Sequence, residues 1–345
     1  MPSTHRRDRP KPRVAKVTLA TLLSITAILA LLLLACTTMP GRSLAGPLPP
    51  LDAREARYEG ERRADVQALA GTIGERNHAN AGTLTRAIEH IEHALSSAGY
   101  EVHHLPYAVA GQQAENLEVV ITGSTKPAEI VVIGAHYDAA MGAPGADDNG
   151  SGTAALLALA RTFAKEKPER TLRFVAFADE EPPYFWTDTM GSLVYARACK
   201  ARNENIVAMI SLESIGYYRD APDSQKYPFP FDIIYPSTGN FLAFVGNVDS
   251  RSLVRHTVEV FRAHGRLPSE GAAVPGVIPG VGWSDHWSFW EQGYPAVMVS
   301  DTAVFRNPYY HTEGDRPDTL DYPRFARAVM GMTWVVADLG GVHLD

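Results

Sequence analysis

Histidine and acidic residues directly follow three apolar segments of the chain that have the length and composition of buried strands. They are His136 and Asp138 after residues 129–134, Asp179, Glu180 and Glu181 after residues 171–178, and Glu213 after residues 206–212. In open α/β sheets, functional sites form beyond the carboxyl ends of the strands. We therefore expect these side chains to meet at one edge of a sheet.

A further pair of carboxylates, Asp147 and Asp148, lies in a loop directly before the amphipathic helix predicted at residues 150–167. One such residue at a strand end carries little information, whereas four such groups at one edge are hard to explain as core. Buried carboxylates are costly unless they are paired or bound to a metal ion. The convergence favours a functional site over a set of helix caps and surface turns.

The segments that position these residues alternate between strands and helices. This alternation predicts an α/β fold, a three-layer sandwich in which helices flank a central mixed, largely parallel sheet. The predicted helices cover residues 59–73, 81–98, 150–167, 191–201, 250–264, 285–292 and 322–339. The predicted strands cover residues 101–107, 115–122, 129–134, 171–178, 206–212, 231–235 and 296–299. Residues 265–283 are rich in Gly and Pro, and we expect an irregular loop there near the site.

The N-terminus has the pattern of an export signal. Residues 1–16 are basic, residues 17–35 carry no charge, and Leu33-Leu34-Ala35-Cys36 resembles a bacterial lipobox. This predicts an export signal over residues 1–35, lipidation at Cys36, a linker over 36–58 and a single domain over 59–345. The domain would then lie in the cell envelope, facing the periplasm or the exterior. An uncleaved anchor helix and a secreted protein with a plainly cleaved signal are the alternatives.

The charge of the chain argues against one class of binding partner, and its cysteine count argues against a fold held by disulfides. The formal net charge is −7, but residues 1–35 contribute +5, so the rest of the chain carries −12. An acidic body argues against nucleic acid as a partner, because phosphates need a basic surface. The chain has two cysteines, Cys36 and Cys199, which are too few for a disulfide framework.

Six short segments together resemble the zinc aminopeptidase family, which includes bacterial leucyl aminopeptidase, aminopeptidase S and the more distant glutaminyl cyclases. The segments are Gly134-Ala135-His136-Tyr137-Asp138, Pro144 to Gly152, Ala178-Asp179-Glu180-Glu181, Gly191-Ser192, Ser284-Asp285-His286 and Tyr310-His311-Thr312. The match runs in the right order from about residue 80 to the C-terminus. The combination is specific, although no single segment is.

The resemblance implies a site with two zinc ions. Its metal ligands would be His136, Asp147, Glu181, Glu213 and His311, with Asp147 bridging the two ions. His136 and Glu213 would complete one site, and Glu181 and His311 the other. Asp138 would orient the ring of His136, while Asp148, Ser284, Asp285 and His286 would support the ligands or line the substrate pocket. The family's cis peptide after the bridging aspartate would fall at Asp147–Asp148, and Glu213 stands where better-known members have aspartate.

This set of groups suits hydrolysis of peptides. Zinc takes nitrogen from His and oxygen from carboxylates, and two ions can lower the pKa of a shared water. Adjacent side chains of Glu180 and Glu181 point in different directions, so Glu181 can hold metal while Glu180 acts as the general base. Release of N-terminal amino acids is the first expectation. The alternatives are a carboxypeptidase or dipeptide hydrolase, a glutaminyl cyclase, against which His136 argues, and a non-catalytic binding lipoprotein.

Aromatic residues near these segments leave the substrate preference open. Tyr184, Phe185, Trp186, Tyr217, Tyr218, Trp283 and Trp287 could line an apolar pocket for a substrate side chain, or they could belong to the core. We expect a preference for apolar N-terminal residues.

Overall fold

The computed structural model describes residues 19–109 and 111–344, so the basic segment predicted at residues 1–16 lies outside the described residues. The described helices are α1 Leu19–Thr37, α2 Ala53–Val66, α3 Ala81–Ser97, α4 Gly152–Phe163, α5 Gly191–Ala201, α6 Arg251–His264, α7 His286–Trp290 and α8 Tyr322–Gly340. The described strands are β1 His103–Val109, β2 Gln112–Ile121, β3 Lys126–His136, β4 Arg170–Phe177, β5 Asn205–Glu213, β6 Leu242–Gly246, β7 Ser269–Ala273 and β8 Ala296–Ser300.

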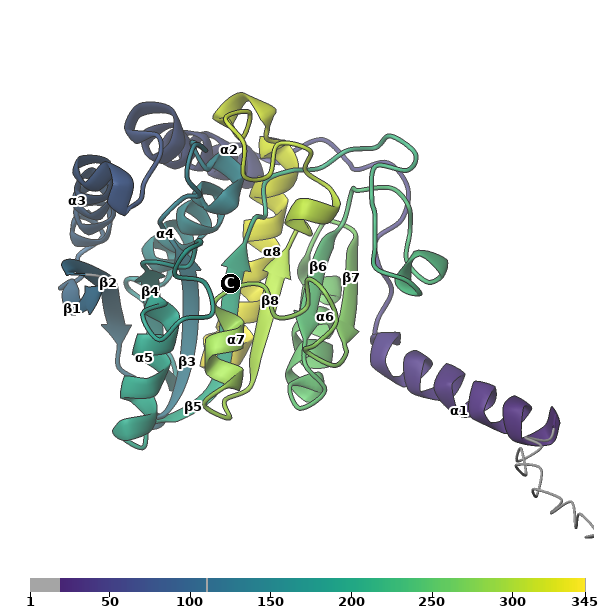
Figure 1. Cartoon of the computed structure of the whole chain (residues 1–345). Helices are drawn as coiled ribbons and strands as arrows, with labels where there is room; N and C mark the ends of the chain where they lie inside the picture. Colours follow the sequence, from purple (N-terminus) through teal and green to yellow (C-terminus); the bar gives the residue numbers. More distant parts are fainter. Residues whose placement is uncertain (1–18, 110, 345) are drawn as a thin grey trace, which may run out of the picture.

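All the described strands form one sheet in the order β1-β2-β4-β3-β5-β8-β6-β7 (Figure 1). The central strands β4, β3, β5 and β8 pair in parallel. At the margins, β1 pairs antiparallel with β2, β2 with β4, and β6 with β8. The predicted mixed, largely parallel sheet is therefore confirmed.

Strand β3 shows why the sequence forms a central strand. Its apolar run is continuous, and side chains alternate between two faces along a strand. Val131 and Ile133 pack into the core on one face, and Ile130 and Val132 pack into the core on the other. All four are buried, so hydrophobic burial on both sides fixes the strand in the middle of the sheet.

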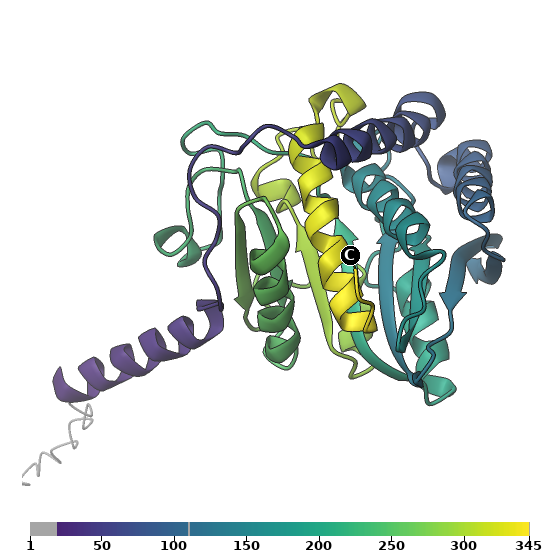
Figure 2. The same ribbon diagram turned by 180° about the vertical axis from the view of Figure 1, so that it is seen from behind.

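Helices cover both faces of the sheet and make the three layers. Helices α4, α6 and α8 lie on one face, and α5 and α7 lie on the other (Figures 1 and 2). Helix α4 consists largely of Ala and Leu, which favour helix, and nearly all of its side chains are buried against the sheet. The layers leave the carboxyl ends of the four parallel strands free to carry loops at one edge.

The structure corrects the prediction at the β6–β7 side of the sheet. The sequence predicts a strand over residues 231–235, but Phe231–Ile233 forms a single turn of 3-10 helix. The short strands β6 and β7 are absent from the prediction, and β7 lies inside the expected loop over 265–283. The sequence of β7, Ser-Glu-Gly-Ala-Ala, has low strand propensity, so its pairing with β6 decides its conformation.

Helix α1 covers most of the apolar segment expected near the N-terminus, and it projects from the main domain (Figure 1). Within residues 19–109 and 111–344, we find no helix of the length and apolar character needed to cross a membrane.

Candidate metal centre

Six side chains at the carboxyl edge of the sheet form two adjacent groups of potential metal ligands. One group is His136, Glu180 and Glu213, and the other is Asp148, Glu181 and His311. Within each group, the nitrogen and oxygen atoms that could bind metal lie within 4.8 Å of one another. Strand β3 ends at His136 and β5 at Glu213, and β4 ends three residues before Glu180, as expected from the parallel pairing.

Asp148 lies between the two histidines. Its Oδ1 is 3.3 Å from Nε2 of His136, and its Oδ2 is 3.0 Å from Nε2 of His311. Each histidine has a second acidic neighbour, because Oε2 of Glu213 lies 3.2 Å from His136 and Oε2 of Glu181 lies 3.1 Å from His311. A carboxylate in this position can reach two metal ions at once.

The structure therefore corrects the assignment of the bridging position to Asp147. Asp147 faces the backbone instead, where its Oδ1 accepts the N–H of Gly216 at 2.9 Å and its Oδ2 accepts Nδ2 of Asn307 at 2.9 Å. The cis peptide bond lies one residue later than expected, at Asp148–Asn149. Two consecutive aspartates offer the same chemistry, so residue type alone does not distinguish the one that points at the histidines.

Asp138 holds two parts of the site together. Its Oδ1 lies 3.3 Å from Nδ1 of His136, and its two oxygens accept the N–H groups of Glu180 at 3.2 Å and Glu181 at 3.0 Å. One carboxylate thus orients the histidine ring and fixes the backbone that presents both glutamates.

Glu180 belongs to the first group, but it lies farther from His136 than Glu213 and Asp148 do. Its Oε2 lies 3.8 Å from Nε2 of His136. Burial raises the pKa of Glu180 well above its ordinary value, against the charge of His136, and repulsion from Glu213 and Glu181 raises it further. Burial and the adjacent Asp148 likewise raise the pKa of Glu181 to about 7.

The unpartnered atoms of the site fit metal ions. Both ring nitrogens of His136, Nε2 of His311 and Oε1 of Glu181 are buried without a hydrogen-bond partner among the described residues. Buried polar atoms are normally paired, and each unpaired one needs an explanation such as a bound ion. Imidazole nitrogen and carboxylate oxygen are the donors that zinc prefers, so the residues present fit zinc.

The predicted segment Ser284-Asp285-His286 lies beside the first group. Oγ of Ser284 donates to Oε2 of Glu213 at 2.7 Å, which orients the glutamate. Asp285 is fully buried, and burial raises its pKa to about 7. His286 faces away, with Nε2 2.7 Å from the carbonyl oxygen of Val281.

Two further residues support the site. Asp315 accepts the N–H groups of Asp147 at 2.9 Å and Asp148 at 3.1 Å, so it fixes the loop that places Asp148 between the two histidines. Arg76 is fully buried and donates to the carbonyl oxygens of Tyr137 at 2.8 Å and Gly145 at 2.9 Å. Each lies in a segment without a recognisable motif and far along the chain from its partners, so the sequence carries no signal for it.

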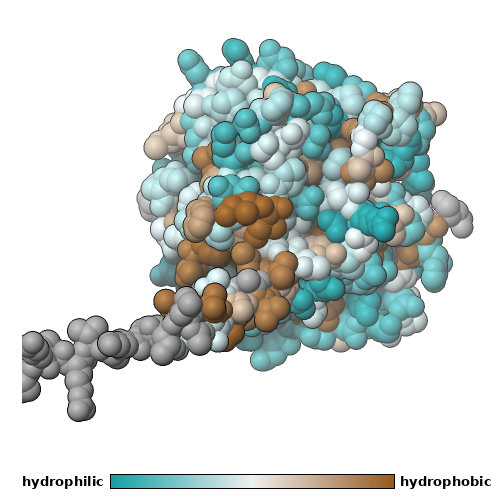
Figure 3. Space-filling model, turned by 90° about the vertical axis from the view of Figure 1, so that its right-hand side faces the viewer, coloured by the Kyte–Doolittle hydropathy of each residue, from teal (hydrophilic) through white to brown (hydrophobic). Residues whose placement is uncertain are grey.

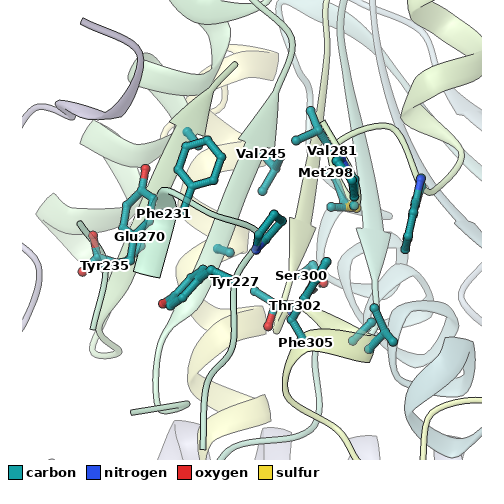
Figure 4. A pocket seen from close by; sticks show the side chains of 18 of the residues that line it. Tyr227, Phe231, Tyr235, Val245, Glu270, Val281, Met298, Ser300, Thr302 and Phe305 are labelled. Carbon is teal, nitrogen blue, oxygen red and sulfur yellow. Dashed lines mark hydrogen bonds between the residues drawn. The ribbon is translucent and has the colours of Figure 1, made fainter. Parts of the chain in front are cut away.

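An apolar cavity of about 890 Å³, counting space open to solvent, is lined by residues of β6, β7 and β8 (Figure 4) and also by Glu213 and Tyr310. Its walls are mainly aromatic and aliphatic, with Phe231, Phe305 and Met298 among them. Of the aromatic residues considered as pocket candidates from the sequence, Trp283 lines this cavity, whereas Tyr217 and Tyr218 are buried.

Comparisons with known proteins bear on the family and the fold of this chain. The sequence profile of Peptidase family M28 matches residues 116–335. Uncharacterized protein YfbL of Escherichia coli is 38% identical over 276 residues, which are 77% of this chain and 84% of that protein. Probable aminopeptidase YDR415C of Saccharomyces cerevisiae is 26% identical over 236 residues, 64% of this chain and 56% of the yeast protein. The solved structure of BSAP, a zinc aminopeptidase from Bacillus subtilis, has a TM-score of 0.63 at 15% identity and covers 81% of this chain and 94% of its own, which shows a shared fold.

Proposed function

Because this chain belongs to peptidase family M28, we propose that it releases N-terminal amino acids from peptides by using two zinc ions and a glutamate general base. Membership of this family makes the chain a zinc-dependent peptidase. The observation that carries the finer proposal is the position of Asp148 between His136 and His311, each with its own acidic neighbour.

In this proposal, His136 and Glu213 would hold one ion and Glu181 and His311 the other, and Asp148, which faces both histidines, would contribute to both sites. When bound, zinc ions supply an activated water and stabilise negative charge on the substrate oxygen. The ligand sets support two ions because each histidine has its own unpaired nitrogen and its own glutamate.

We assign the proton transfer to Glu180. Its side chain lies beside the ligands, and Asp138 fixes its backbone through the N–H of Glu180. A carboxylate at this position can take a proton from water and then deliver it to the leaving amine. A general base that is positioned in this way typically contributes about 10²–10⁴-fold to the rate.

The apolar cavity supports a preference for apolar or aromatic N-terminal residues. It adjoins Glu213 and Tyr310, so a substrate side chain that enters it would leave the adjacent peptide bond near the ligands. Apolar walls stabilise an apolar side chain by about 25 cal/mol per Å² removed from water.

A panel of peptides tests this function. The same sequence would be offered with a free N-terminus, an acetylated N-terminus and an amidated C-terminus, with and without a strong chelator. We expect cleavage of the free and the amidated peptides, no cleavage of the acetylated peptide, and loss of all activity with chelator. Cleavage of the acetylated peptide would contradict an aminopeptidase, and activity that survives metal removal would contradict the role of zinc.

We also propose that the chain is exported and lipidated at Cys36, on the strength of the apolar segment and the lipobox-like residues before that cysteine. Labelling of cells with a fatty-acid analogue would test it. The wild-type chain should incorporate label and Cys36→Ser should not, and equal labelling of the two would exclude this site.

A further inference from the structure

An apolar surface surrounds the point at which α1 meets the main domain. Figure 3 shows apolar residues gathered on the face from which the N-terminal segment projects. Two loops, residues 214–241 and 274–285, contribute large exposed side chains there, with Phe229 at 80%, Ile233 at 74% and Val277 at 91% exposure. Scattered apolar side chains are normal on a surface, whereas apolar groups that gather on one face mark an interaction site.

The end of α1 is fixed to this part of the domain. Leu33 and Cys36 pack against a buried cluster formed by Phe231, Val274 and Val281. This cluster comes from the same two loops that expose Phe229, Ile233 and Val277. The position of α1 is therefore tied to the position of the exposed apolar side chains.

Hydrogen bonds from α6 reinforce the attachment. Nε of Arg251 donates to the carbonyl oxygen of Ala35 at 3.0 Å, and Nη1 of Arg262 donates to that of Pro40 at 3.0 Å. Arg255 donates to the carbonyl oxygen of Thr38. These bonds hold the segment after α1 against the domain and place three cationic side chains close to the apolar surface.

The two loops have distinct inner and outer sides. Phe231 and Tyr235 line the apolar cavity beside the metal ligands, while Phe229 and Ile233 point outward and do not line it. The outer side chains therefore have no role in filling the core or the cavity. Their exposure to water is unfavourable by about 25 cal/mol per Å² unless something covers them.

We propose that this face of the domain rests on a lipid bilayer, with Phe229, Ile233 and Val277 inserted into the leaflet that would hold α1 before processing and the lipid on Cys36 after it. Helix α1 argues for lipid as the occupant, because it carries exposed apolar side chains along its length and leads directly into the apolar surface. These side chains are Leu22, Leu23, Ile25, Ile28, Leu31, Leu32 and Leu34. Arg251 and Arg255 complement anionic headgroups, each worth about 1 kcal/mol near such a surface, whereas Arg262 is largely buried beside Glu270. The wall of the cavity would then lie at the membrane interface.

A fluorescent label at residue 229 tests the contact directly. The full chain would carry Cys36→Ser and Phe229→Cys and be labelled with an environment-sensitive dye, while the remaining Cys199 is fully buried. It would be reconstituted in vesicles of phosphatidylethanolamine and phosphatidylglycerol. We expect a blue shift, and stronger quenching by a nitroxide near the headgroups than by one at the bilayer centre, because interfacial side chains insert about 5–10 Å.

The matched control is Cys36→Ser with Met141→Cys. Met141 is 66% exposed and follows β3, on the far side of β5 and β8 from the two loops. Its label should show neither a shift nor quenching. An unshifted label at 229, or equal quenching at 141, would overturn the proposal. A concentration-dependent shift at 229 without vesicles would also overturn it, because a second copy of the chain would then be the occupant.

Two added substitutions, Ile233→Ser and Val277→Ser, separate this contact from catalysis. In the chain labelled at residue 229, which α1 still anchors in the vesicle, they should reduce quenching by the nitroxide near the headgroups, while the rate on a soluble peptide should stay unchanged because these side chains do not line the cavity. Quenching equal to that of the chain without these two substitutions would contradict the proposal. The label reports lipid contact whether or not the chain cleaves peptides.

Discussion

Oδ2 of Asp148 lies 3.0 Å from Nε2 of His311, while Oδ1 of the same carboxylate faces His136. Both histidines lower the pKa of Asp148, although burial opposes them, so the carboxylate stays ionised between the two rings. Asp147 shares neither contact. The two neighbouring aspartates therefore predict two different mutant phenotypes.

We predict that Asp148→Asn loses zinc and activity, whereas Asp147→Asn mainly loses stability. Asn at 148 offers one neutral oxygen in place of a bridging carboxylate, so bound zinc should fall below that of wild type and the rate should fall by at least about 10²-fold. Asn at 147 can still accept from Gly216 but places an N–H₂ against Asn307, which costs about 1–3 kcal/mol. Metal analysis, peptide hydrolysis and urea unfolding of both variants check this. Normal zinc content in Asp148→Asn would contradict it.

Glu180→Gln should keep its zinc and lose its rate. The amide of Gln has the same shape as the carboxylate but cannot accept a proton from water, so kcat should fall by about 10²–10⁴-fold. The metal content should stay close to that of wild type because Glu213 and Asp148 remain beside His136. Glu181→Gln is the matched control, and it should reduce zinc content as well as rate. A Glu180→Gln enzyme with more than a tenth of the wild-type kcat would rule out the general base.

The sequence allows the sheet and most of the site to be predicted, because both rest on local patterns. Buried strands such as β3 have continuous apolar runs, and the acidic and histidine residues follow these runs directly. The direction of Asp147 and Asp148 is not local. It depends on the N–H of Gly216 and on Asn307, which the fold brings to Asp147 from elsewhere in the chain.

Strand β7 and Arg76 escaped prediction for the same physical reason. Strand β7 has no apolar run, and it forms because β6 offers a free edge for pairing. Arg76 has no acidic hydrogen-bond partner that a charge pattern could suggest, because it donates to backbone carbonyl oxygens. A partner that is a peptide group leaves no mark on the sequence.

Arg76→Met should destabilise the chain strongly. The methionine keeps much of the volume but leaves buried carbonyl oxygens of Tyr137, Pro144 and Gly145 without a donor. Each unsatisfied buried group costs about 1–3 kcal/mol, so we expect a loss of roughly 3–5 kcal/mol in the free energy of unfolding. Urea unfolding with zinc present measures it.

The control for this arginine is Arg197→Met. Arg197 pairs at 2.8 Å with Asp188 on the surface, where the two side chains are 48% and 85% exposed. Its loss should change stability by less than about 1 kcal/mol. If Arg76→Met lowered the free energy of unfolding no more than Arg197→Met, the buried hydrogen bonds of Arg76 would not contribute to stability.

Removal of zinc should lower the melting temperature. Without cations, the carboxyl groups of Asp148, Glu180, Glu181 and Glu213 are crowded together in a buried site, and several of them carry raised pKa values. Zinc that binds the folded chain at 100 times its Kd would stabilise it by about 2.7 kcal/mol. Calorimetry of chelated and zinc-restored protein should show the higher melting temperature with zinc. Asp148→Asn should show a smaller rise, and an equal rise in both would place the stabilising ion elsewhere.

Glu204 predicts a separate sensitivity to acid, remote from the metal ligands. Burial alone would raise the pKa of Glu204, but hydrogen bonds from Arg173 at 2.8 Å and Arg202 at 2.9 Å outweigh it and lower the pKa from 4.5 to about 2. The folded state therefore binds the proton less tightly than the unfolded state. The stabilisation is complete above about pH 4.5 and is lost as the pH falls towards 2.

We expect Glu204→Gln to remove this part of the pH dependence. Between pH 5 and pH 3, wild type should lose about 1 kcal/mol more of its free energy of unfolding than Glu204→Gln, a modest figure because solvent screens this partly exposed group. Urea unfolding at the two pH values measures the difference. The control is Asp188→Asn, which breaks an exposed ion pair with Arg197. It should lose as much of its free energy of unfolding between the two pH values as wild type does. Parallel acid profiles for wild type and Glu204→Gln would show that the two arginines do not act on this carboxylate.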